Sequence, residues 1–586
     1  MVTVPPTPLF TTVIVVFAVV FGILWTAVNF YHLYPYVQYF LVARLFGADS
    51  DPYTRLPEGH EFVSPPTFDV LLPAYEEGNV IHQAISSIRS ADYPQHRIRI
   101  NVLVEPEDAD TRDALATLAE EYRFDEVPIP SEYEEVVVPE KYPGMPNKPR
   151  ALNFGFDSTD GDIVGVIDAE DIVDPDLFST VAYALVDQGN DYVQGKLDMV
   201  NEYDGWKNLV FRAEYAFWFR LLVPSFHFVG YPVPLGGTTN FFRRETLERA
   251  SDLRLEQYGT PWSDRQQAWL SRNGFPGSVP WDPRNVTEDF ELGILLWKEG
   301  FDMTLIDVVT REESPLTANA WIRQRTRWQK GKLYTFLQYL EHPPASLRGR
   351  FHGLFQSFLP HLAPINIVGI VVLTMVAASL GYGVPLAVQV VLVLGVVFLV
   401  EMFVLHATGY WLVTERRGIT RFVRSILIAT TVAFYWLLLW GAELRAMKQL
   451  TATNYTGKRP HTTVATSPNR ATEPCRYPPV RGSESDPESG AGVARSYCDV
   501  ARRPTHAERS TPRRPRGGHR RRSRRGVPPD RARRVRRRDR THAQRRRRRR
   551  GTGVDPRRRR HLPRERPRER RLRRGPAPHE SYTFAT

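Results

Sequence analysis

The chain has 586 residues, enough for two or three domains, and its net charge of +12 is the sum of two unlike parts. Residues 461–586 contain 39 of the 77 Lys and Arg residues but only 12 of the 65 acidic residues, so this tail carries about +27 and the rest about −15. The acidic body argues against a nucleic-acid-binding protein. Both cysteines, Cys475 and Cys498, lie in the tail, so the body has no disulfide and no cysteine metal site.

The first predicted element is a membrane-spanning helix over residues 9–31, which are almost all apolar and long enough to cross about 30 Å of hydrocarbon. No Lys or Arg precedes this stretch, whereas Arg44 and Arg55 follow it, which favours a cytoplasmic location for the next domain. The basic start and small-residue exit of a cleavable signal peptide are missing. We therefore expect residues 1–48 to form a membrane anchor with an interfacial segment.

Residues 60–350 have the mixed composition of a soluble α/β domain. Strand patterns and one helical pattern occur in the order 68–72, 79–90 (the helix), 98–104 and 162–167. This alternation predicts a parallel sheet, and such sheets bind ligands at the carboxyl ends of their strands. Glu105 and Asp168 each follow a predicted strand, so we expect both at the binding site.

Residues 351–450 contain three further apolar stretches, at 354–381, 385–413 and 426–444. Pro360 and Pro364 predict that the first begins as an interfacial or broken helix. Basic residues flank the last stretch on both sides, and only one side is cytoplasmic if that stretch crosses the membrane. Three crossings place the C-terminus outside, whereas two crossings and a surface helix place it inside.

The tail at 461–586 is rich in Arg, Pro, Gly, Ser and His and has too few apolar residues to form a core, so we expect disorder. One interpretation is an arm that binds nucleic acid or anionic lipid. The other is a reading-frame shift, because Lys, Trp and Met are lost abruptly before the tail begins.

Three short motifs carry the chemistry. Asp168-Ala169-Glu170-Asp171 offers carboxylate oxygens that suit Mg²⁺ or Mn²⁺ together with a diphosphate, although a solvated acidic loop has the same composition. Thr287-Glu288-Asp289 precedes a helical pattern, so Thr287 fits a helix N-cap and Asp289 fits a general base. Gln324-Arg325-Thr326-Arg327-Trp328 fits either sugar stacking and phosphate binding or a helix anchored at a membrane surface.

The order of these motifs, with a spacing of 35 positions from Asp289 to Gln324, resembles that of family-2 glycosyltransferases of the cellulose-synthase and hyaluronan-synthase type, which carry D, DxD, TED and Q(Q/R)xRW motifs. The resemblance covers about residues 65–335. It extends to three more segments, which resemble the nucleotide loop, the diphosphate-contacting segment and the acceptor-side loop: Pro73-Ala74-Tyr75-Glu76-Glu77, Lys148–Asn153 and Gly236–Phe242.

The resemblance implies a GT-A-type, Rossmann-like α/β domain inserted between transmembrane helices of a multi-pass cell-membrane protein, with the catalytic domain in the cytoplasm. It implies an inverting enzyme that transfers sugar from a UDP-sugar to a growing polysaccharide or a lipid-linked glycan, with Asp289 as general base. Asp168 and Glu170 would hold Mg²⁺ or Mn²⁺, with Asp171 as an alternative ligand. The implied donor-binding residues are Pro73, Tyr75, Glu77, Glu105, Asp108, Lys148 and Asp168, and the implied acceptor- and diphosphate-binding residues are Glu288, Gln324, Arg327 and Trp328.

Three positions depart from the family pattern. Glu105, or else Asp108, stands where the family has its first Asp, Glu76 replaces the Asn of the opening loop, and Glu170 replaces the second Asp of DxD. These departures suggest a first rival, a catalytically inactive membrane scaffold. The Arg-rich tail suggests a second, a membrane-tethered nucleic-acid-binding protein. Three or four crossings are few for a glycan channel in a monomer, so an oligomer would be needed to supply one. Membrane lipid is expected as a partner.

Overall fold

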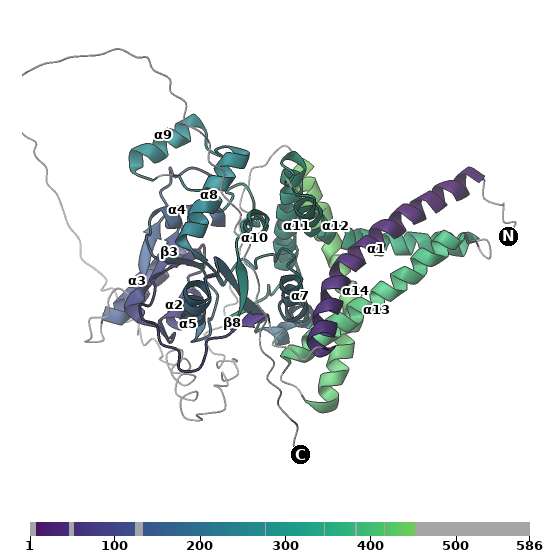
Figure 1. The fold of residues 1–586 in the computed structure, drawn as a ribbon, viewed down its shortest axis with the longest axis horizontal. Helices are drawn as coiled ribbons and strands as arrows, with labels where there is room; N and C mark the ends of the chain where they lie inside the picture. The colour runs from purple at the N-terminus through teal and green to yellow at the C-terminus, as the bar shows by residue number, and fades with distance from the viewer. Residues whose placement is uncertain are drawn as a thin grey trace, which may run out of the picture. The chain divides into compact units, whose positions relative to one another are not determined.

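The computed structural model describes residues 8–45, 52–123, 133–275, 277–344, 346–380, 384–414 and 417–451. Figure 1 shows the order of the elements along the chain. The tail at 461–586, with both interpretations of its role, lies outside the described residues.

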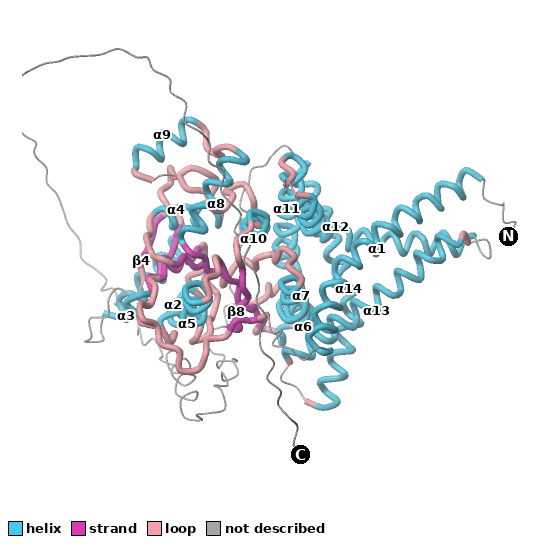
Figure 2. Tube along the Cα trace, in the orientation of Figure 1, coloured by secondary structure: helices cyan, strands magenta, loops and turns pink. Residues whose placement is uncertain are grey.

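An eight-stranded mixed sheet forms the centre of the α/β domain (Figure 2), in the order β1-β8-β6-β7-β5-β2-β3-β4. The strands are β1 (Tyr53–Thr54), β2 (Phe68–Ala74), β3 (Ile98–Val104), β4 (Glu134–Val137), β5 (Ile163–Val166), β6 (Tyr192–Met199), β7 (Asn240–Arg243) and β8 (Met303–Glu312). The α/β fold is as expected, and the three strands predicted from the sequence, β2, β3 and β5, are parallel as predicted. The whole sheet is nevertheless mixed, because β7 runs antiparallel to β5 and β6. Strand direction depends on the route of the chain between strands, and the four residues of β7 are too few to show it in the sequence.

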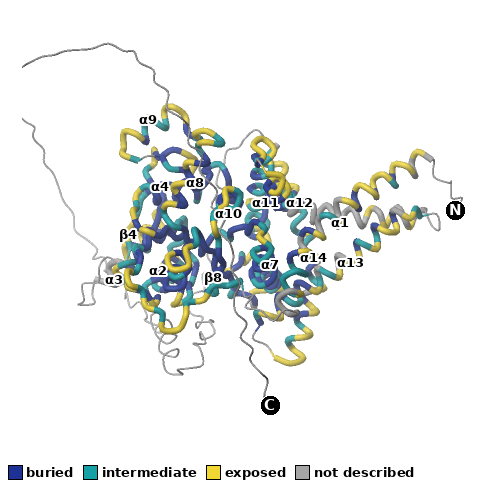
Figure 3. The backbone as a smooth tube through the Cα atoms, in the orientation of Figure 1, coloured by how far each residue is buried: buried dark blue, intermediate teal, exposed yellow. Residues whose placement is uncertain are grey.

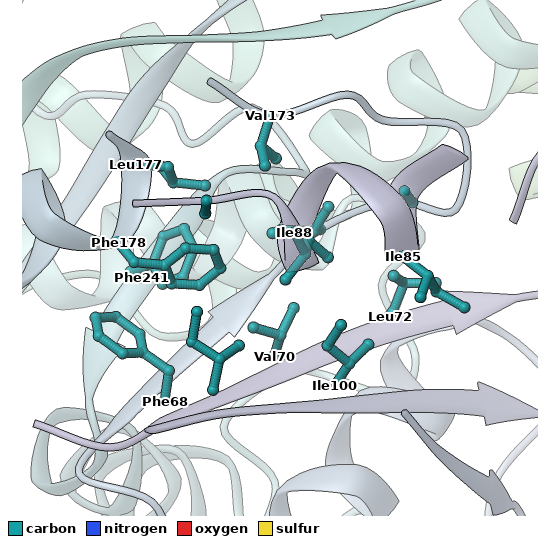
Figure 4. Close-up of a cluster of buried hydrophobic side chains, with 14 of the residues drawn as sticks. Phe68, Val70, Leu72, Ile85, Ile88, Ile100, Val173, Leu177, Phe178 and Phe241 are labelled. Atoms are coloured by element: carbon teal, nitrogen blue, oxygen red, sulfur yellow. The ribbon is translucent and has the colours of Figure 1, made fainter. Parts of the chain in front are cut away.

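Helices cover both faces of the sheet. They are α2 (Ile81–Arg89), α3 (Ala109–Arg123), α4 (Lys148–Asp157), α5 (Leu177–Ala182), α8 (Arg244–Tyr258), α9 (Asp264–Asn273) and α10 (Glu288–Glu299). Because side chains alternate along a strand, Val70 and Leu72 of β2 join one core with Ile85 of α2 (Figure 4), whereas Leu71 joins the other core with Leu152 of α4. The two cores hold the strand ends, and the loops after them, in fixed positions.

The remaining helices are α1 (Pro8–Leu45), α6 (Trp206–Phe217), α7 (Val223–Phe228), α11 (Ala318–Glu341), α12 (Leu347–Leu380), α13 (Leu386–Val413) and α14 (Gly418–Thr451). A π-helical turn, Trp218–Leu222, joins α6 to α7. The expected break in α12 is wrong, because the helix continues through Pro360 and Pro364. Each proline removes only one backbone donor, and α12 packs along α11 and α14, which supports the long helix.

One helix among the described residues, Gly418–Leu450 within α14, is long and apolar enough to cross a membrane. The other apolar stretches expected to cross the membrane coincide with α1, α12 and α13. The apolar segments found in α1 and α13 are shorter, for example Thr12–Ile23 in α1 and Val388–Val397 in α13. Figure 3 shows buried residues concentrated in the α/β domain and exposed residues along α1 and α13. Several of those exposed side chains are large and apolar, for example Val16 and Val396. The structural indication of membrane association is therefore α14, with exposed apolar side chains beside it.

Candidate active site

One pocket collects side chains from all three motifs. It has a volume of about 270 Å³, and its walls include Asp168 and Glu170 after β5, Glu288 and Asp289 at the start of α10, and Gln324, Arg327 and Trp328 on α11. The structure therefore brings together residues that are far apart in the sequence, as the motif order led us to expect. Lys148 at the start of α4 and Gly237 before β7 also line this pocket.

Lys148 connects the acidic motif to the acceptor-side loop. Asn147 caps α4 by accepting a hydrogen bond from the Arg150 backbone N–H at 2.9 Å, which fixes Lys148 at the first helical position. The Lys148 Nζ donates to Asp168 Oδ1, and to the Gly237 carbonyl at 2.8 Å. Burial opposes its charge, but Asp168 and Glu288 together raise the pKa of Lys148 above its usual value. The lysine is therefore a permanent cation beside Asp168.

Asp171 lies behind the pocket and braces the loop. Its Oδ2 accepts the Asp168 backbone N–H at 3.0 Å and the Thr238 hydroxyl, and its side chain is fully buried. Within the Asp168–Asp171 motif, the carboxylates that face the pocket are therefore those of Asp168 and Glu170. The sequence left Asp171 and Glu170 as alternative ligands, and this geometry favours Glu170.

The carboxylates in this region repel one another. Burial, followed by the charge of Asp168, raises the pKa of Glu170 to about 7. Burial and the neighbouring Asp289 raise the pKa of Glu288 to about 7. At the end of β8, burial and the charge of Asp171 raise the pKa of Glu312 well above its usual value. A cationic ligand would relieve this repulsion.

The donor set fits a divalent metal that arrives with a phosphate ligand. Within the described parts of the chain, no three His, Cys, Asp or Glu side chains are grouped closely enough to hold a metal by themselves. Mg²⁺ usually takes only one or two protein carboxylates and completes its shell with water and phosphate oxygens. Asp168 and Glu170 provide such a pair, because both face the pocket.

Asp289 lies against the glycine-rich loop. Gly237 has a φ of +83°, and a Cβ at this position would lie 3.0 Å from Asp289 Oδ2, so glycine leaves the room that the carboxylate needs. Burial raises the pKa of Asp289, while the nearby Lys148 lowers it. Thr287 holds the N-cap position of α10, but its hydroxyl donates to Asn285 Oδ1 at 3.3 Å and makes no capping hydrogen bond.

Helix α11 is fastened directly to the loop before Asp289. A Cβ at Gly331 would lie 2.1 Å from Thr287 Oγ1, so the helix and loop approach closely only because residue 331 is glycine. One turn further on, Asn285 Nδ2 donates to Thr335 Oγ1 at 2.8 Å, and both side chains are buried. These contacts set the position of Arg327 relative to Asp289.

Arg325 supports the aromatic wall of the pocket. Its guanidinium binds both carboxylate oxygens of Glu214, at 2.9 and 2.6 Å, and lies 4.3 Å from the centre of the Trp328 ring. It also donates to the Tyr435 hydroxyl on α14 at 3.0 Å. This ion pair holds Trp328 in place, so Arg325 acts as a positioning residue.

Two neighbours of Arg325 have polar groups available to a ligand. The buried Oε1 of Gln324 has no hydrogen-bond partner within the described chain. Arg327 lines the pocket and makes no ion pair there with any residue in the described ranges. Unmatched polar groups at a cavity wall are typical of a binding site.

The remaining expected donor residues lie beside this pocket or away from it. Pro73 and Tyr75 belong to the end of β2 and the loop after it. Burial, with the charges of Glu170 and Asp168, raises the pKa of Glu77 to about 9, which places Glu77 near the acidic motif. Asp108 accepts the Glu76 backbone N–H at 2.9 Å and so holds the loop, in which Glu76 has a φ of 59°.

Glu105 lies in a separate hollow, where it is already paired. Arg150 Nη1 donates to both of its carboxylate oxygens, at 2.8 and 2.6 Å, and both side chains are almost completely buried. The hollow is also lined by Pro106, Glu140 and Pro146. Glu105 therefore stands at the expected strand end, but with a cation of the protein beside it.

Residues 65–331 match a family model described as "Glycosyltransferase like family 2". This segment is a family-2 glycosyltransferase-like domain. The glycosyltransferase class expected from the sequence is thus confirmed for the domain. The narrower cellulose-synthase or hyaluronan-synthase type stays a prediction.

Several known proteins are similar to the glycosyltransferase domain. A probable glycosyltransferase of Bacillus subtilis (strain 168) is 26% identical over 277 residues, which are 47% of this chain and 57% of that protein. An N-acetylglucosaminyltransferase of Mesorhizobium japonicum is 26% identical over 272 residues, 45% and 55% of the two chains. A beta-monoglucosyldiacylglycerol synthase of Synechocystis sp. is 24% identical over 339 residues, 55% and 62%. The chain therefore spans little more than half the length of these curated relatives.

Among solved structures, a mannosyltransferase from Pyrobaculum calidifontis in complex with GDP-Man and Mn²⁺ is 16% identical and has a TM-score of 0.42. The match covers 72% of this chain and 99% of that one. A likeness of this size carries no weight for function.

The motifs did not reveal every residue of the glycosyltransferase domain that lines the pocket. Trp218, Glu214 and Glu312 come from other elements, and only the fold brings them to the site. Lys332 also lines it. Its position four residues after Trp328 on a helical pattern was a signal that sequence reasoning missed.

Proposed function

We propose that the protein is a membrane-embedded, inverting glycosyltransferase that moves a sugar from a UDP-sugar to a growing polysaccharide or a lipid-linked glycan. The observation that carries this proposal is the single pocket shared by Asp168, Asp289 and Trp328 inside a family-2 glycosyltransferase-like domain. The relatives named above act, by their names, in N-acetylglucosamine transfer and in the synthesis of a glucosyl lipid. Both a glycan and a lipid acceptor are therefore compatible with the proposal.

In this mechanism the donor diphosphate lies beside the acidic motif. A Mg²⁺ or Mn²⁺ ion held by Asp168 and Glu170 would, when bound, supply positive charge to the leaving diphosphate. Lys148 adds a fixed cation, because its Nζ is held by Asp168 and by the Gly237 carbonyl. Arg327, which makes no ion pair among the described side chains, would bind phosphate oxygens.

Asp289 would remove the proton from the acceptor hydroxyl. The hydroxyl oxygen then forms a bond to the anomeric carbon while the bond from that carbon to the diphosphate oxygen breaks, which inverts the anomeric carbon. A raised pKa makes Asp289 a stronger base than an ordinary aspartate. The acceptor sugar would stack on Trp328 and donate a hydrogen bond to the unmatched Oε1 of Gln324.

We place the nucleoside of the donor in the hollow beside Glu105. This hollow and the main pocket both adjoin the start of α4, since Arg150 lines the first and Lys148 lines the second. A UDP-sugar bound across the start of α4 would have its base near Glu105 and its diphosphate near Lys148. The loop of Pro73, Tyr75 and Glu77 would cover the donor from the side of β2.

We further propose a multi-pass protein of the cell membrane. Helix α14 is the candidate crossing, and α1, α12 and α13 would supply the others, with the glycosyltransferase domain in the cytoplasm. The rival function is a catalytically inactive scaffold of the same fold. It is favoured by one observation, the engagement of Glu105 by Arg150.

The direct test is UDP release and product analysis with the full-length protein in membranes. A panel of UDP-sugars is supplied with Mg²⁺, with Mn²⁺, or with EDTA. The proposal predicts release with one or a few sugars, loss in EDTA, and loss in Asp289→Asn. An absence of release and of product with every donor and both metals would favour the scaffold.

A further inference from the structure

The pocket continues along α11 beyond Trp328, to a wall that none of the three motifs accounts for. We call this wall the Lys332 subsite and define it as Lys332, Trp218 and Phe290, which all line the pocket. The Lys332 Nζ lies 6.0 Å from the centre of the Trp218 ring and 5.6 Å from that of Phe290. Trp218 begins the π-helical turn Trp218–Leu222, and such turns are frequent at functional sites.

The ammonium of Lys332 has no counter-ion of its own. It makes no hydrogen bond or ion pair with any residue that the structure describes. Two carboxylates close enough to act on it are already engaged: Glu214 binds Arg325, and Glu443 on α14 binds His361 at 2.8 Å. The third, Asp289, is the proposed base. Burial, with the nearby charge of Arg325, lowers the pKa of Lys332 to about 8.

A cation beside two aromatic rings, with no ion pair among the described residues, favours an anionic ligand. Taking an ammonium partly out of water without a partner is costly, and a ligand oxygen with negative charge offsets that cost. The apolar rings of Trp218 and Phe290 lower the local dielectric, which strengthens such a contact. The family-2 motifs leave this cation unused, because they end at Trp328.

The position of the subsite indicates which part of the acceptor carries the anionic group. Lys332 is four residues after Trp328 on α11, so the two side chains lie on one face, about 6 Å apart along the helix axis. Helix α11, which carries Lys332, packs along α14, the candidate membrane-spanning helix, and Arg325 in the pocket wall donates to Tyr435 of α14. The pocket therefore adjoins α14 on the side of Arg325. A lipid-linked acceptor would enter from that side.

We propose that the Lys332 subsite binds the phosphate group of a lipid-linked acceptor, about one helical turn from the acceptor position at Trp328. This inference rests on the proposed function, and it narrows the acceptor to a phosphorylated lipid. Lys332 and Arg327 then bind different phosphates, one of the acceptor and one of the donor.

The test compares three acceptors with the full-length protein in membranes: a sugar linked to polyprenol through a diphosphate (a polyprenyl diphosphate sugar), uncharged diacylglycerol and a uronic-acid oligosaccharide. Lys332→Met should raise the KM for the polyprenyl diphosphate sugar about 10- to 100-fold, as expected for the loss of one charge-assisted hydrogen bond, with little change in kcat. Lys332→Arg should restore most of the affinity. The KM for diacylglycerol should change less than about two-fold.

A matched control is Lys330→Met, which removes the same charge from α11 at a position that does not line the pocket. Binding of the polyprenyl diphosphate sugar to the Asp289→Asn protein gives a second readout that needs no turnover, and Lys332→Met in that background should weaken it to the same extent.

Equal effects of Lys332→Met on the polyprenyl diphosphate sugar and on diacylglycerol, or none on either, would overturn the inference and leave the proposed function intact. A selective effect on the uronic-acid oligosaccharide would overturn it in favour of an acidic glycan. If the wild-type protein transfers sugar to no acceptor and releases no UDP, the proposed function itself fails.

Discussion

Two acidic regions at the strand ends of this domain differ in how their charges are balanced. At the first, Glu105 is bound through both oxygens by Arg150, and the two side chains are 6% and 2% exposed. At the second, Asp168, Glu170 and Asp289 share Lys148 and Arg327, and burial and mutual repulsion raise the pKa of Glu170. The comparison teaches that an acidic residue at a strand end does not by itself define a catalytic or metal site. The candidate catalytic site lies where the protein leaves charges unbalanced beside a cavity.

One short helix supplies a cation to each region. Lys148 and Arg150 are two residues apart at the start of α4, which is about 200° of rotation, so they point to opposite sides. Lys148 reaches Asp168, and Arg150 reaches Glu105. Both contacts depend on the Asn147 cap, which sets where the helix begins.

The largest expected effect comes from the unbalanced region. Asp289→Asn removes the proposed base without adding bulk, and transfer should fall about 10²- to 10⁴-fold or more. Product formation under saturating donor and acceptor measures the loss. The variant should unfold close to the wild-type temperature, since Asp289 makes no ion pair with any residue that the structure describes. Wild-type turnover in this variant would exclude Asp289 as the base.

In the balanced region we expect a loss of stability. Arg150→Met leaves the buried carboxylate of Glu105 without its cation and should cost about 3–5 kcal/mol. Denaturant unfolding of the purified protein, followed by tryptophan fluorescence, measures the change. The double variant Arg150→Met with Glu105→Gln should recover part of the loss, because no unpaired charge is left. If Arg150→Met alone is as stable as the wild type, the ion pair between Arg150 and Glu105 does not stabilise the fold, and the contrast with the unbalanced carboxylates of the pocket fails.

The pH dependence of the rate sharpens the comparison. The base works only when deprotonated, so activity is present above the pKa of Asp289 and is lost as the pH falls through it. Burial raises this pKa, and the acidic limb of kcat/KM, which reports the free enzyme, should therefore lie above the value of about 3.9 for a free aspartate. Lys148→Met removes the charge that lowers the pKa, so the limb should move further toward neutral pH. A limb at the ordinary aspartate value in both proteins contradicts this account.

The smallest expected effect concerns the contact that fastens α11 to the loop before Asp289. Thr335→Val keeps the side-chain shape but leaves Asn285 Nδ2 without its acceptor, at a cost of about 1–2 kcal/mol. Thermal unfolding should show the decrease, and Thr335→Ser, which keeps the hydroxyl, should not. If transfer falls as much as in Asp289→Asn, the contact also positions Arg327 for catalysis.

The sequence by itself determined much of the domain. Residues 98–104 are expected as a strand and form β3, and the strand expected at 68–72 extends to Ala74 as β2, because apolar, β-branched and aromatic residues predominate in both segments and favour strands. The order of the three motifs indicated one crevice, and their side chains do line one pocket. Patterns of this kind can be read from the sequence because they depend on residues that are close together along the chain.

Only the tertiary structure decided which charges are paired. The direction of β7, the turn of Asp171 away from the pocket and the capture of Glu105 by Arg150 all depend on residues that are distant in sequence. The same holds for Lys332. The sequence shows only a lysine on a helical pattern, and the structure places its Nζ near the rings of Trp218 and Phe290. Pairing is a matter of a few ångströms in space, since Coulomb and hydrogen-bond energies fall steeply with distance in a protein interior. A linear sequence does not contain those distances.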